Sequence, residues 1–246
     1  EFMSKSIIII PSRLAATRLP NKPLININNK PLIIHVFEKA VKSQIGEVYV
    51  ATCDNEIAIE VERNGGKCIM TDNRHTTGTD RVYEAAQKLN LKESDVIINL
   101  QGDEPMINPL DIERLCKISR EKNLYISTLA FKLKNNDDYE NTNVVKVITK
   151  NKISDNSTEE ALNFYRKVDL NKNNNVYHHL GIYLYKLSAL KKFVNLKKSE
   201  NEIKEKLEQL RALDNKMKIN VILANYFSSG IDTKKDLEEY IKKINK

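Results

Sequence analysis

Short apolar runs alternate with amphipathic stretches along the first part of the chain. Residues 7–10 are four consecutive isoleucines, a run that predicts a strand buried on both faces. Similar runs predict further strands at 47–52, 67–70 and 95–100. Helical patterns lie between these strands, at 31–37, from 54 to about 65, and at 80–90. This alternation predicts an α/β fold, a doubly wound and mainly parallel sheet that binds ligands at the carboxyl ends of its strands.

The pattern changes beyond a predicted helix at 111–121. Strands are predicted at 125–132, 144–149 and 181–185 without full helices between them. We interpret the segment at about 122–190 as a smaller mixed or antiparallel lobe within a single domain that spans residues 4–246. The chain then closes with a long charged helix at about 200–213, a strand at 219–223 and a helix from residue 234.

The composition narrows the classes of partner. Of the 246 residues 41% are hydrophobic, and the formal net charge of +7 would attract nucleic acid, an anionic membrane or an acidic small molecule. Nucleic acid is disfavoured because the sequence has no basic stripe with interleaved aromatic residues. Many lysines, such as those at 197–198 and 242–243, are expected on exposed helix faces. The apolar run at 7–11 is too short for a signal peptide or a membrane span, so we expect a soluble protein with no membrane partner.

The cysteines and the first residues of the chain give little indication of a catalytic or binding function. Cys53, Cys68 and Cys116 are odd in number and form no CxxC motif, which predicts neither a disulfide framework nor a zinc site and suits the cytoplasm. Glu1 and Phe2 precede Met3, and we interpret them as a cloning remnant.

A long basic loop follows the first predicted strand. Residues 11–23 carry Arg13, Arg18 and Lys22 and no acidic side chain. Guanidinium groups make bidentate contacts with phosphate and lysine adds a point charge, so the loop is a candidate polyphosphate site. The glycine patterns of dinucleotide-binding and P-loop proteins do not occur, which disfavours both classes.

Two aspartates are candidate magnesium ligands. Asp103 follows the strand at 95–100, and Gly102 allows a tight turn that presents the carboxylate at the sheet edge. Magnesium prefers one or two carboxylates together with phosphate oxygens and water, as in a nucleoside triphosphate site. Asp232 precedes the last helix, where an aspartate by itself is more often an N-cap than a metal ligand.

Other polar groups give weaker signals. The loop at 75–81 leads into a helix and can present amides and hydroxyls to a base or a phosphate. His178 and His179 have no cysteine or carboxylate at ligand spacing, and His35 lies in an apolar helix, where a structural role is expected. The run at 208–211 would by default be a solvated helix face.

Taken together, these segments resemble the 3-deoxy-manno-octulosonate cytidylyltransferase family. The resemblance extends in order from residue 7 almost to the C terminus. Its motifs lie at 11–13, 18–24, 50–52, 77–81, 99–105, 179–183, 208–211 and 230–233. The resemblance implies a nucleotide-diphospho-sugar transferase-like fold, a homodimer built through the smaller lobe, and Mg²⁺ as cofactor. It also implies transfer of CMP from CTP to the sugar acid Kdo, with release of pyrophosphate, for lipopolysaccharide synthesis.

The same resemblance assigns roles to individual positions. Matched catalytic positions are Arg13, Arg18, Lys22 and Asp103, of which the three cations would bind the CTP phosphates. Thr77, Gly78 and Gln101 match positions around the cytidine, and Asp103 and Asp232 match the magnesium ligands. Positions that match the sugar site are Arg166, His179, Tyr183, Glu208 and Gln209.

The chain also departs from the family pattern. Around Arg166 the sequence differs from the usual one, and the segment up to His179 is short and rich in Asn. This segment would cover the sugar pocket, so a different 2-keto sugar acid, such as a sialic acid or an amino-substituted octulosonate, stays an alternative. A non-catalytic nucleotide-binding relative is a second alternative. Lys234 replaces the usual proline at a helix N1 position, which accepts most residues.

Overall fold

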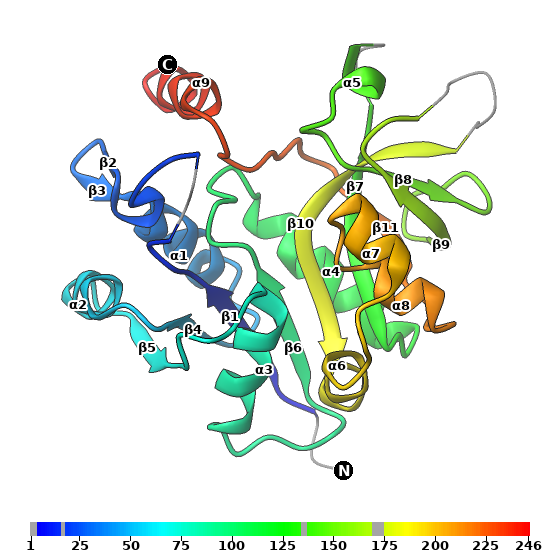
Figure 1. Cartoon of the computed structure of the whole chain (residues 1–246), viewed down its shortest axis with the longest axis horizontal. Coiled ribbons are helices and arrows are strands. Elements are labelled where there is room, and N and C mark those ends of the chain that lie inside the picture. Colours follow the sequence, from blue (N-terminus) through cyan, green and yellow to red (C-terminus); the bar gives the residue numbers. More distant parts are fainter. Residues whose placement is uncertain (1–3, 16–17, 134–136, 169–174) are drawn as a thin grey trace.

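The fold is built on one large sheet. The computed structural model describes residues 4–15, 18–133, 137–168 and 175–246; the two residues interpreted as a cloning remnant lie outside these ranges. In the described part of the chain, nine strands form a sheet in the order β5-β4-β1-β6-β10-β7-β11-β9-β8. Figure 1 shows β10 curving through the middle of the molecule, between β6 and β7.

One half of the sheet is parallel, as predicted. Its strands are β5 (Lys67–Met70), β4 (Glu47–Thr52), β1 (Ser6–Pro11) and β6 (Val96–Leu100), and each neighbouring pair runs in the same direction. The isoleucines of β1 face two different layers, since Ile7 and Ile9 belong to one buried cluster and Ile8 and Ile10 to another. This explains why the run is apolar at every position.

Most of the antiparallel strand pairs lie in the other half of the sheet. Strands β7 (Ile126–Lys132) and β8 (Lys146–Thr149) pair antiparallel with the long β10 (Val176–Lys186). Strand β11 (Asn220–Leu223) lies parallel to β7 and antiparallel to β9 (Thr158–Tyr165). These strands belong to the same sheet as the parallel ones, and the division into a main body and a smaller lobe stays a prediction.

Two strands of the large sheet differ most from the sequence prediction. β9 was not predicted, because Glu159, Glu160 and Asn163 interrupt its apolar pattern. β10 begins at Val176, before the predicted strand at 181–185, and a bulge between His179 and Tyr183 shifts its register against β7. A bulge breaks the two-residue period, so the pattern fits the strand only beyond it.

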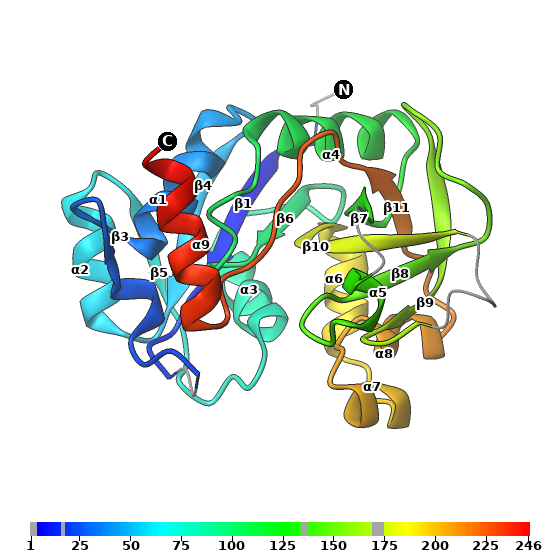
Figure 2. The same cartoon turned by 90° about the horizontal axis from the view of Figure 1, so that it is seen from above.

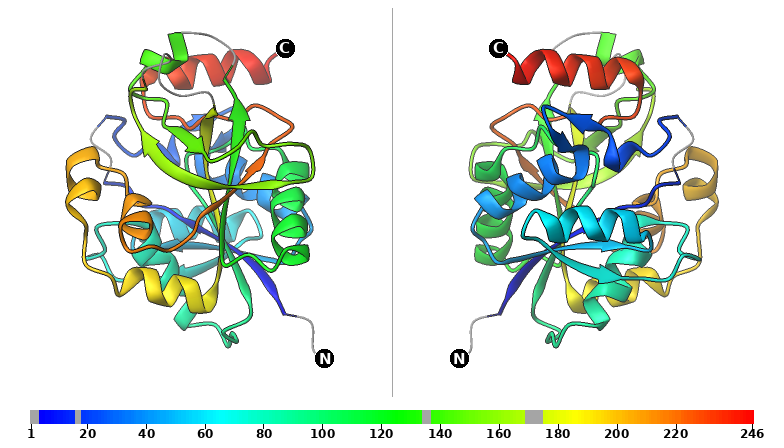
Figure 3. Two further views of the ribbon diagram at one scale, coloured as in Figure 1. Left: turned by 90° about the vertical axis from the view of Figure 1, so that its right-hand side faces the viewer. Right: turned by 90° about the vertical axis from the view of Figure 1, so that its left-hand side faces the viewer.

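Helices cover both faces of the sheet. The buried cluster on one face includes α1 (Leu32–Lys42), α2 (Asn55–Arg63) and α4 (Pro109–Glu121). The cluster on the other face includes α3 (Gly78–Gln87), α6 (Leu187–Val194) and α8 (Leu210–Asp214). Figure 3 shows green α4 on one side of the sheet, with yellow α6 and orange α8 on the other. The predicted α/β architecture is therefore confirmed, although α6 was not predicted.

The remaining elements are mostly short. They are η1 (Lys22–Leu24), β2 (Asn26–Ile27), β3 (Lys30–Pro31), α5 (Asp137–Glu140), α7 (Glu200–Glu205) and α9 (Lys234–Ile244). Figures 1 and 2 show the segment after β11 crossing the molecule to reach α9. Among the described residues, no helix has both the length and the apolar character that a membrane span requires.

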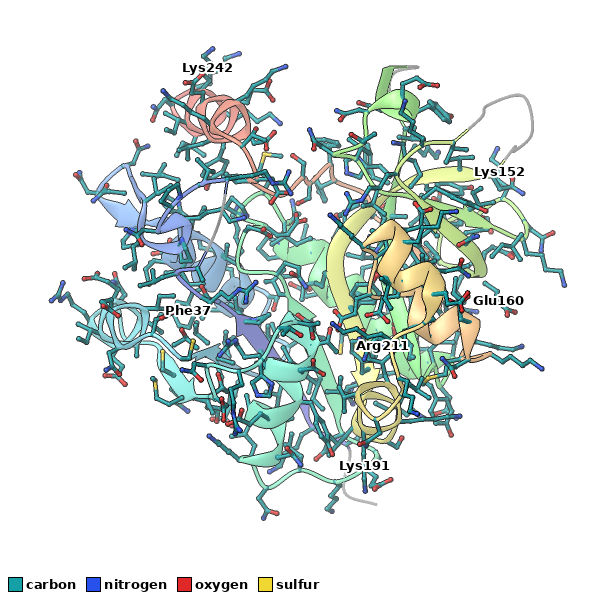
Figure 4. All side chains as sticks on the ribbon, viewed as in Figure 1. Phe37, Lys152, Glu160, Lys191, Arg211 and Lys242 are labelled. Atoms are coloured by element: carbon teal, nitrogen blue, oxygen red, sulfur yellow. The ribbon has the colours of Figure 1, made fainter. Side chains whose placement is uncertain are left out.

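The predicted helix at 200–213 is wrong in detail. Lys206 takes a left-handed conformation with φ of 54°, which ends α7 and turns Leu207 into the core. The default reading of 208–211 as a solvated face is also wrong, because Arg211 is 3% exposed and pairs with Glu202 at 2.6 Å. The lysines at 197–198 and 242–243 are exposed as predicted, but those at 197–198 lie between α6 and α7 and not on a helix face. Figure 4 shows Lys152, Lys191 and Lys242 at the periphery.

Candidate active site

A cleft of about 300 Å³ lies at the carboxyl edge of the parallel strands. We call it the basic cleft, because Arg13, Lys22 and Arg81 line it. Three segments line it: the loop after β1, the start of α3 and the turn after β6. Among the predicted nucleotide-binding residues, it is lined by Arg13, Lys22, Thr77, Gly78 and Gln101. Arg18 is exposed on the same loop and is not among the residues that line this cleft.

Backbone geometry explains the shape of this cleft. Thr77 caps α3, since its hydroxyl accepts a hydrogen bond from the Asp80 amide at 3.1 Å. The free amides and the dipole at a helix start favour an anion. At Gly102 an added Cβ would lie 2.8 Å from the carbonyl oxygen of Pro11, so the turn after β6 passes β1 at a distance that only glycine permits.

Lys22 joins the two candidate metal ligands. Its Nζ lies 2.8 Å from Asp103 Oδ2 and 3.3 Å from Asp232 Oδ1, and it donates to the Ile231 carbonyl at 2.9 Å. Burial opposes the charge of Lys22, but attraction to Asp103 and Asp232 outweighs it and raises the pKa of Lys22. Residues distant in the sequence thus form a site for positive charge between two carboxylates.

Asp232 does not cap the last helix. Thr233 is the N-cap of α9 and forms a capping box with Asp236, which leaves the carboxylate of Asp232 directed at Lys22. Among the described residues, no group of three or more His, Cys, Asp or Glu side chains is arranged to hold a metal. A pair of carboxylates completed by phosphate oxygens and water is the donor set that suits Mg²⁺.

A larger cavity of about 770 Å³ adjoins the first, and both are lined by Gln101 and Asp103. Four of the predicted sugar-binding residues, His179, Tyr183, Glu208 and Gln209, line it. The hydroxyl of Tyr183 and Oε1 of Glu208 are buried without a hydrogen-bond partner in the described part of the protein. Buried polar atoms of this kind normally have partners, so the wall of the cavity is suited to a polar ligand.

Glu208 reaches this cavity through a contact with α3. The hydroxyl of Thr79 donates to Glu208 Oε2 at 2.8 Å, and burial raises the pKa of Glu208. This contact ties the segment after α7 to the start of α3, next to Thr77 and Gly78. One hydrogen bond therefore connects the wall of the larger cavity to the helix that begins at the first cleft.

Comparison with known proteins assigns the family. The cytidylyltransferase family matches residues 7–219. The 3-deoxy-manno-octulosonate cytidylyltransferase of Thermodesulfovibrio yellowstonii is 46% identical over 250 residues, covering 98% of this chain and 98% of its own. That of Bartonella quintana is 42% identical with the same coverage of both chains. This chain belongs to the 3-deoxy-manno-octulosonate cytidylyltransferase family.

Solved structures agree with this assignment. A CMP:2-keto-3-deoxy-manno-octonic acid synthetase complexed with CTP has a TM-score of 0.88 and 35% identity, over 98% of this chain and 99% of that one. A UTP-bound UGPase from Acinetobacter baumannii has a TM-score of 0.70 at 11% identity, over 98% and 93% of the two chains, and shares the fold. As a member of this family the chain is a nucleotidyltransferase.

Arg166 differs from the other positions matched to the sugar site of the family. Its guanidinium donates to three backbone carbonyls, those of Thr142, Glu205 and Lys206, at 3.2 to 3.3 Å. It is not among the residues that line the larger cavity. In this structure Arg166 connects the end of α7 to the loop before β8, and its predicted contact with the sugar stays a prediction.

Glu104 was not predicted to have a role, although it lies in the motif at 99–105. Its carboxyl accepts hydrogen bonds from Ser228 Oγ at 2.9 Å and from the Gly181 amide at 3.2 Å. Burial, and then the charge of Asp103, raises the pKa of Glu104 to about 8. The sequence signal that was available is the position of Glu104 next to Asp103 in the turn that directly follows the buried strand β6.

Proposed function

We propose that this chain transfers CMP from CTP to 3-deoxy-D-manno-octulosonate, giving CMP-Kdo and pyrophosphate for lipopolysaccharide synthesis. The observation that carries the proposal is the position of Asp103, which lines both the basic cleft and the larger polar cavity. A nucleotide in the first and a sugar acid in the second would meet at this carboxylate.

The basic cleft provides the charge that a triphosphate needs. Arg13 and Lys22 line it, Arg18 is exposed on the same loop, and the N terminus of α3 faces the same cleft. In the reaction, the anomeric oxygen of the sugar forms a bond to the α-phosphorus while the bond to the bridging oxygen breaks. Pyrophosphate leaves with the bonding electrons and the hydroxyl proton is released. Fixed cations that offset charge on the phosphoryl oxygens supply most of the acceleration in such a step.

We propose Mg²⁺ as the cofactor, held by Asp103 and Asp232. The proposal is supported by Lys22, whose ammonium group lies between these two carboxylates and pairs with both of them. Bound there, the ion would offset charge on the phosphates and lower the pKa of a coordinated hydroxyl. Lys22 would then be free to turn toward the α-phosphate from the same loop.

The larger cavity is the proposed sugar site. Tyr183 and Glu208 offer buried polar atoms that have no hydrogen-bond partner among the described residues, and His179 and Gln209 add two more polar side chains. A ligand with many hydroxyl groups can satisfy such atoms. Arg166 lies outside the lining, and we propose that it shapes the pocket through the loop before β8.

Assembly and location are also proposals. The family resemblance favours a homodimer, which sedimentation of the purified chain would test. We place the reaction in the cytoplasm, where CTP is made, and the free thiols of Cys53, Cys68 and Cys116 suit that compartment.

The deciding experiment measures pyrophosphate release from CTP and Mg²⁺ with three additions: Kdo, a sialic acid, or no sugar. Kdo alone is expected to support release. Asp103→Asn, which keeps the shape of the side chain and removes its charge, is expected to abolish it while CTP still binds. Release with sialic acid instead would indicate a different 2-keto sugar acid, and CTP binding without release for any sugar would indicate a non-catalytic relative.

A further inference from the structure

The bulge in β10 places an unusual hydrogen-bond relay beside the larger cavity. Opposite β7, His179 pairs with Ala130 and Tyr183 with Thr128, so the bulge carries Leu180, Gly181 and Ile182. Ile182 is paired with Leu100 of β6 but not with β7, and its carbonyl lies 2.6 Å from the hydroxyl of Thr128. The same hydroxyl lies 2.9 Å from Nε2 of His179.

The direction of these two hydrogen bonds follows from counting protons. A threonine hydroxyl has one proton, and a backbone carbonyl can only accept. At 2.6 Å the proton of Thr128 must therefore lie on the Ile182 side, because two oxygen lone pairs would otherwise face each other. Thr128 is left with lone pairs for His179, so Nε2 must carry a hydrogen.

The imidazole of His179 is held firmly in this orientation. Thr128 is fully buried, and the His179 ring contacts Phe164 and Tyr183 with centroid distances of 5.2 Å each. Burial, and then the neighbouring His178, lowers the pKa of His179 to about 3. A neutral imidazole that is protonated at Nε2 has a bare Nδ1, which can only accept a hydrogen bond.

We propose that Thr128 is a positioning residue that fixes His179 as the Nε2–H tautomer, so that Nδ1 offers a hydrogen-bond acceptor to a ligand hydroxyl in the larger cavity. Because His179 lines that cavity and Thr128 does not, Thr128 acts only through the histidine. The inference rests on the proposed sugar site for its ligand, but the tautomer itself does not depend on that function.

The ligand chemistry follows from the tautomer. A hydroxyl group can donate to a bare nitrogen, whereas a carboxylate cannot. His179 thus selects the hydroxylated part of a sugar acid, and the carboxylate of the same ligand must bind elsewhere in the site.

The first test is ¹⁵N spectroscopy of the histidine rings in the whole chain, without substrate. The sequence has four histidines, and His179→Gln identifies the signal. The expected result near neutral pH is a protonated Nε2 and a bare Nδ1 in the wild type. Thr128→Val, which removes the acceptor, is expected to move His179 toward the other tautomer. A bare Nε2 in the wild type, or an unchanged tautomer in Thr128→Val, would overturn the proposal whether or not the chain transfers CMP.

The second test separates positioning from folding. Thr128→Val is expected to raise KM for the sugar about tenfold, as for the loss of one hydrogen bond, with KM for CTP unchanged. Thr128→Ser keeps the hydroxyl and is expected to restore both the tautomer and the KM. If Thr128→Val changes both KM values in proportion to its loss of folded protein, or if serine fails to restore the sugar KM, Thr128 has only a structural role.

Discussion

The backbone amide of Gly181 donates a hydrogen bond to Glu104 Oε1 over 3.2 Å, which links the bulge of β10 to the turn after β6. Ser228 donates to the other oxygen of the same carboxyl, and the Ile231 amide donates to the Asp103 carbonyl at 2.8 Å. The segments that carry Asp103 and Asp232 are thereby fastened to each other and to β10. The two candidate magnesium ligands are positioned by these contacts and not by their own helices or strands.

Gly181→Ala should disrupt this arrangement. An added Cβ would lie 2.6 Å from Glu104 Oε1, a distance that forces either the carboxyl or the bulge to move. Overpacking of a buried site costs about 1 to 3 kcal/mol, and we expect a loss of that size in urea denaturation together with lower CMP transfer. Glu104→Asp draws the carboxyl back, so a double-mutant cycle should show that the two changes are coupled. Additive effects would mean that the clash is not with Glu104.

Lys22→Met should make the folded protein respond more strongly to Mg²⁺. Without the ammonium group, Asp103 and Asp232 lose the charge that they share, and a divalent cation can replace it without competition. In thermal denaturation without nucleotide, we expect Mg²⁺ to raise the Tm of the variant about 2–4 °C more than that of the wild type, the shift that 1 kcal/mol causes at this size.

The matched control is Lys30→Met, which removes a surface lysine that pairs with Glu38 of α1. Its response to Mg²⁺ should equal that of the wild type. CMP transfer by Lys22→Met should fall by about a hundredfold or more, because a cation next to the phosphates is lost. An equal Mg²⁺ response in both variants would argue against a metal site between Asp103 and Asp232.

Local patterns predicted the parallel half of the sheet and the residues at its edge. The strands at 47–52 and 67–70 have the predicted bounds, because each is a short run of mainly apolar residues that begins at a charged residue. Asp103 was found because it closely follows a buried strand, and Arg13 and Lys22 were found because they lie on the basic loop after the first strand. Their meeting with Asp232, which lies far along the sequence, was implied only by resemblance to a family.

Features that depend on distant contacts were not predictable in this way. The left-handed Lys206 interrupts a sequence that favours a continuous helix, and Leu207 gains burial in return. The partners of Arg166 are backbone carbonyls of residues 142, 205 and 206, which carry no side-chain signal at all. The role of Glu104 depends likewise on the Gly181 amide, which the bulge in β10 exposes.

Acid should destabilise the protein through His178 and His179. Burial lowers the pKa of His178 to about 4 and that of His179 to about 3, below the ordinary 6.5, so both rings are neutral when folded. In the unfolded chain these two histidines bind protons below pH 6.5, whereas in the folded chain they do so only at lower pH. The stability that the two neutral rings contribute is therefore complete above pH 6.5 and is lost as the pH falls toward 4. We expect the unfolding free energy to drop by more than about 1 kcal/mol per pH unit in this window.

A double variant, His178→Gln with His179→Gln, isolates this contribution from that of the carboxyl groups. Its unfolding free energy should fall less steeply between pH 6.5 and 4 than that of the wild type. Denaturant titrations at several pH values would give both slopes. Parallel slopes would show that the two histidines do not stay neutral in the folded state.

Lys146 provides the last prediction, because it is a fully buried lysine that binds only backbone. Its Nζ donates to the carbonyls of Asn141, Val144 and Arg166 at 2.7, 2.7 and 2.5 Å. Three acceptors match the three protons of an ammonium group. Asn141 and Val144 also line the larger cavity, so this one side chain holds part of the proposed sugar site against the end of β9.

Lys146→Met fills the same space but leaves three carbonyls without a donor. We expect a loss of about 2 to 4 kcal/mol in urea denaturation, since unsatisfied buried acceptors are costly. Lys152→Met is the matched control, because Lys152 is exposed and its replacement should change stability by less than about 0.5 kcal/mol. Where the variant stays folded, KM for the sugar should rise more than KM for CTP, because the loop borders the larger cavity and not the basic cleft. Equal stability of the two lysine variants would mean that the three carbonyl contacts contribute nothing to holding this loop.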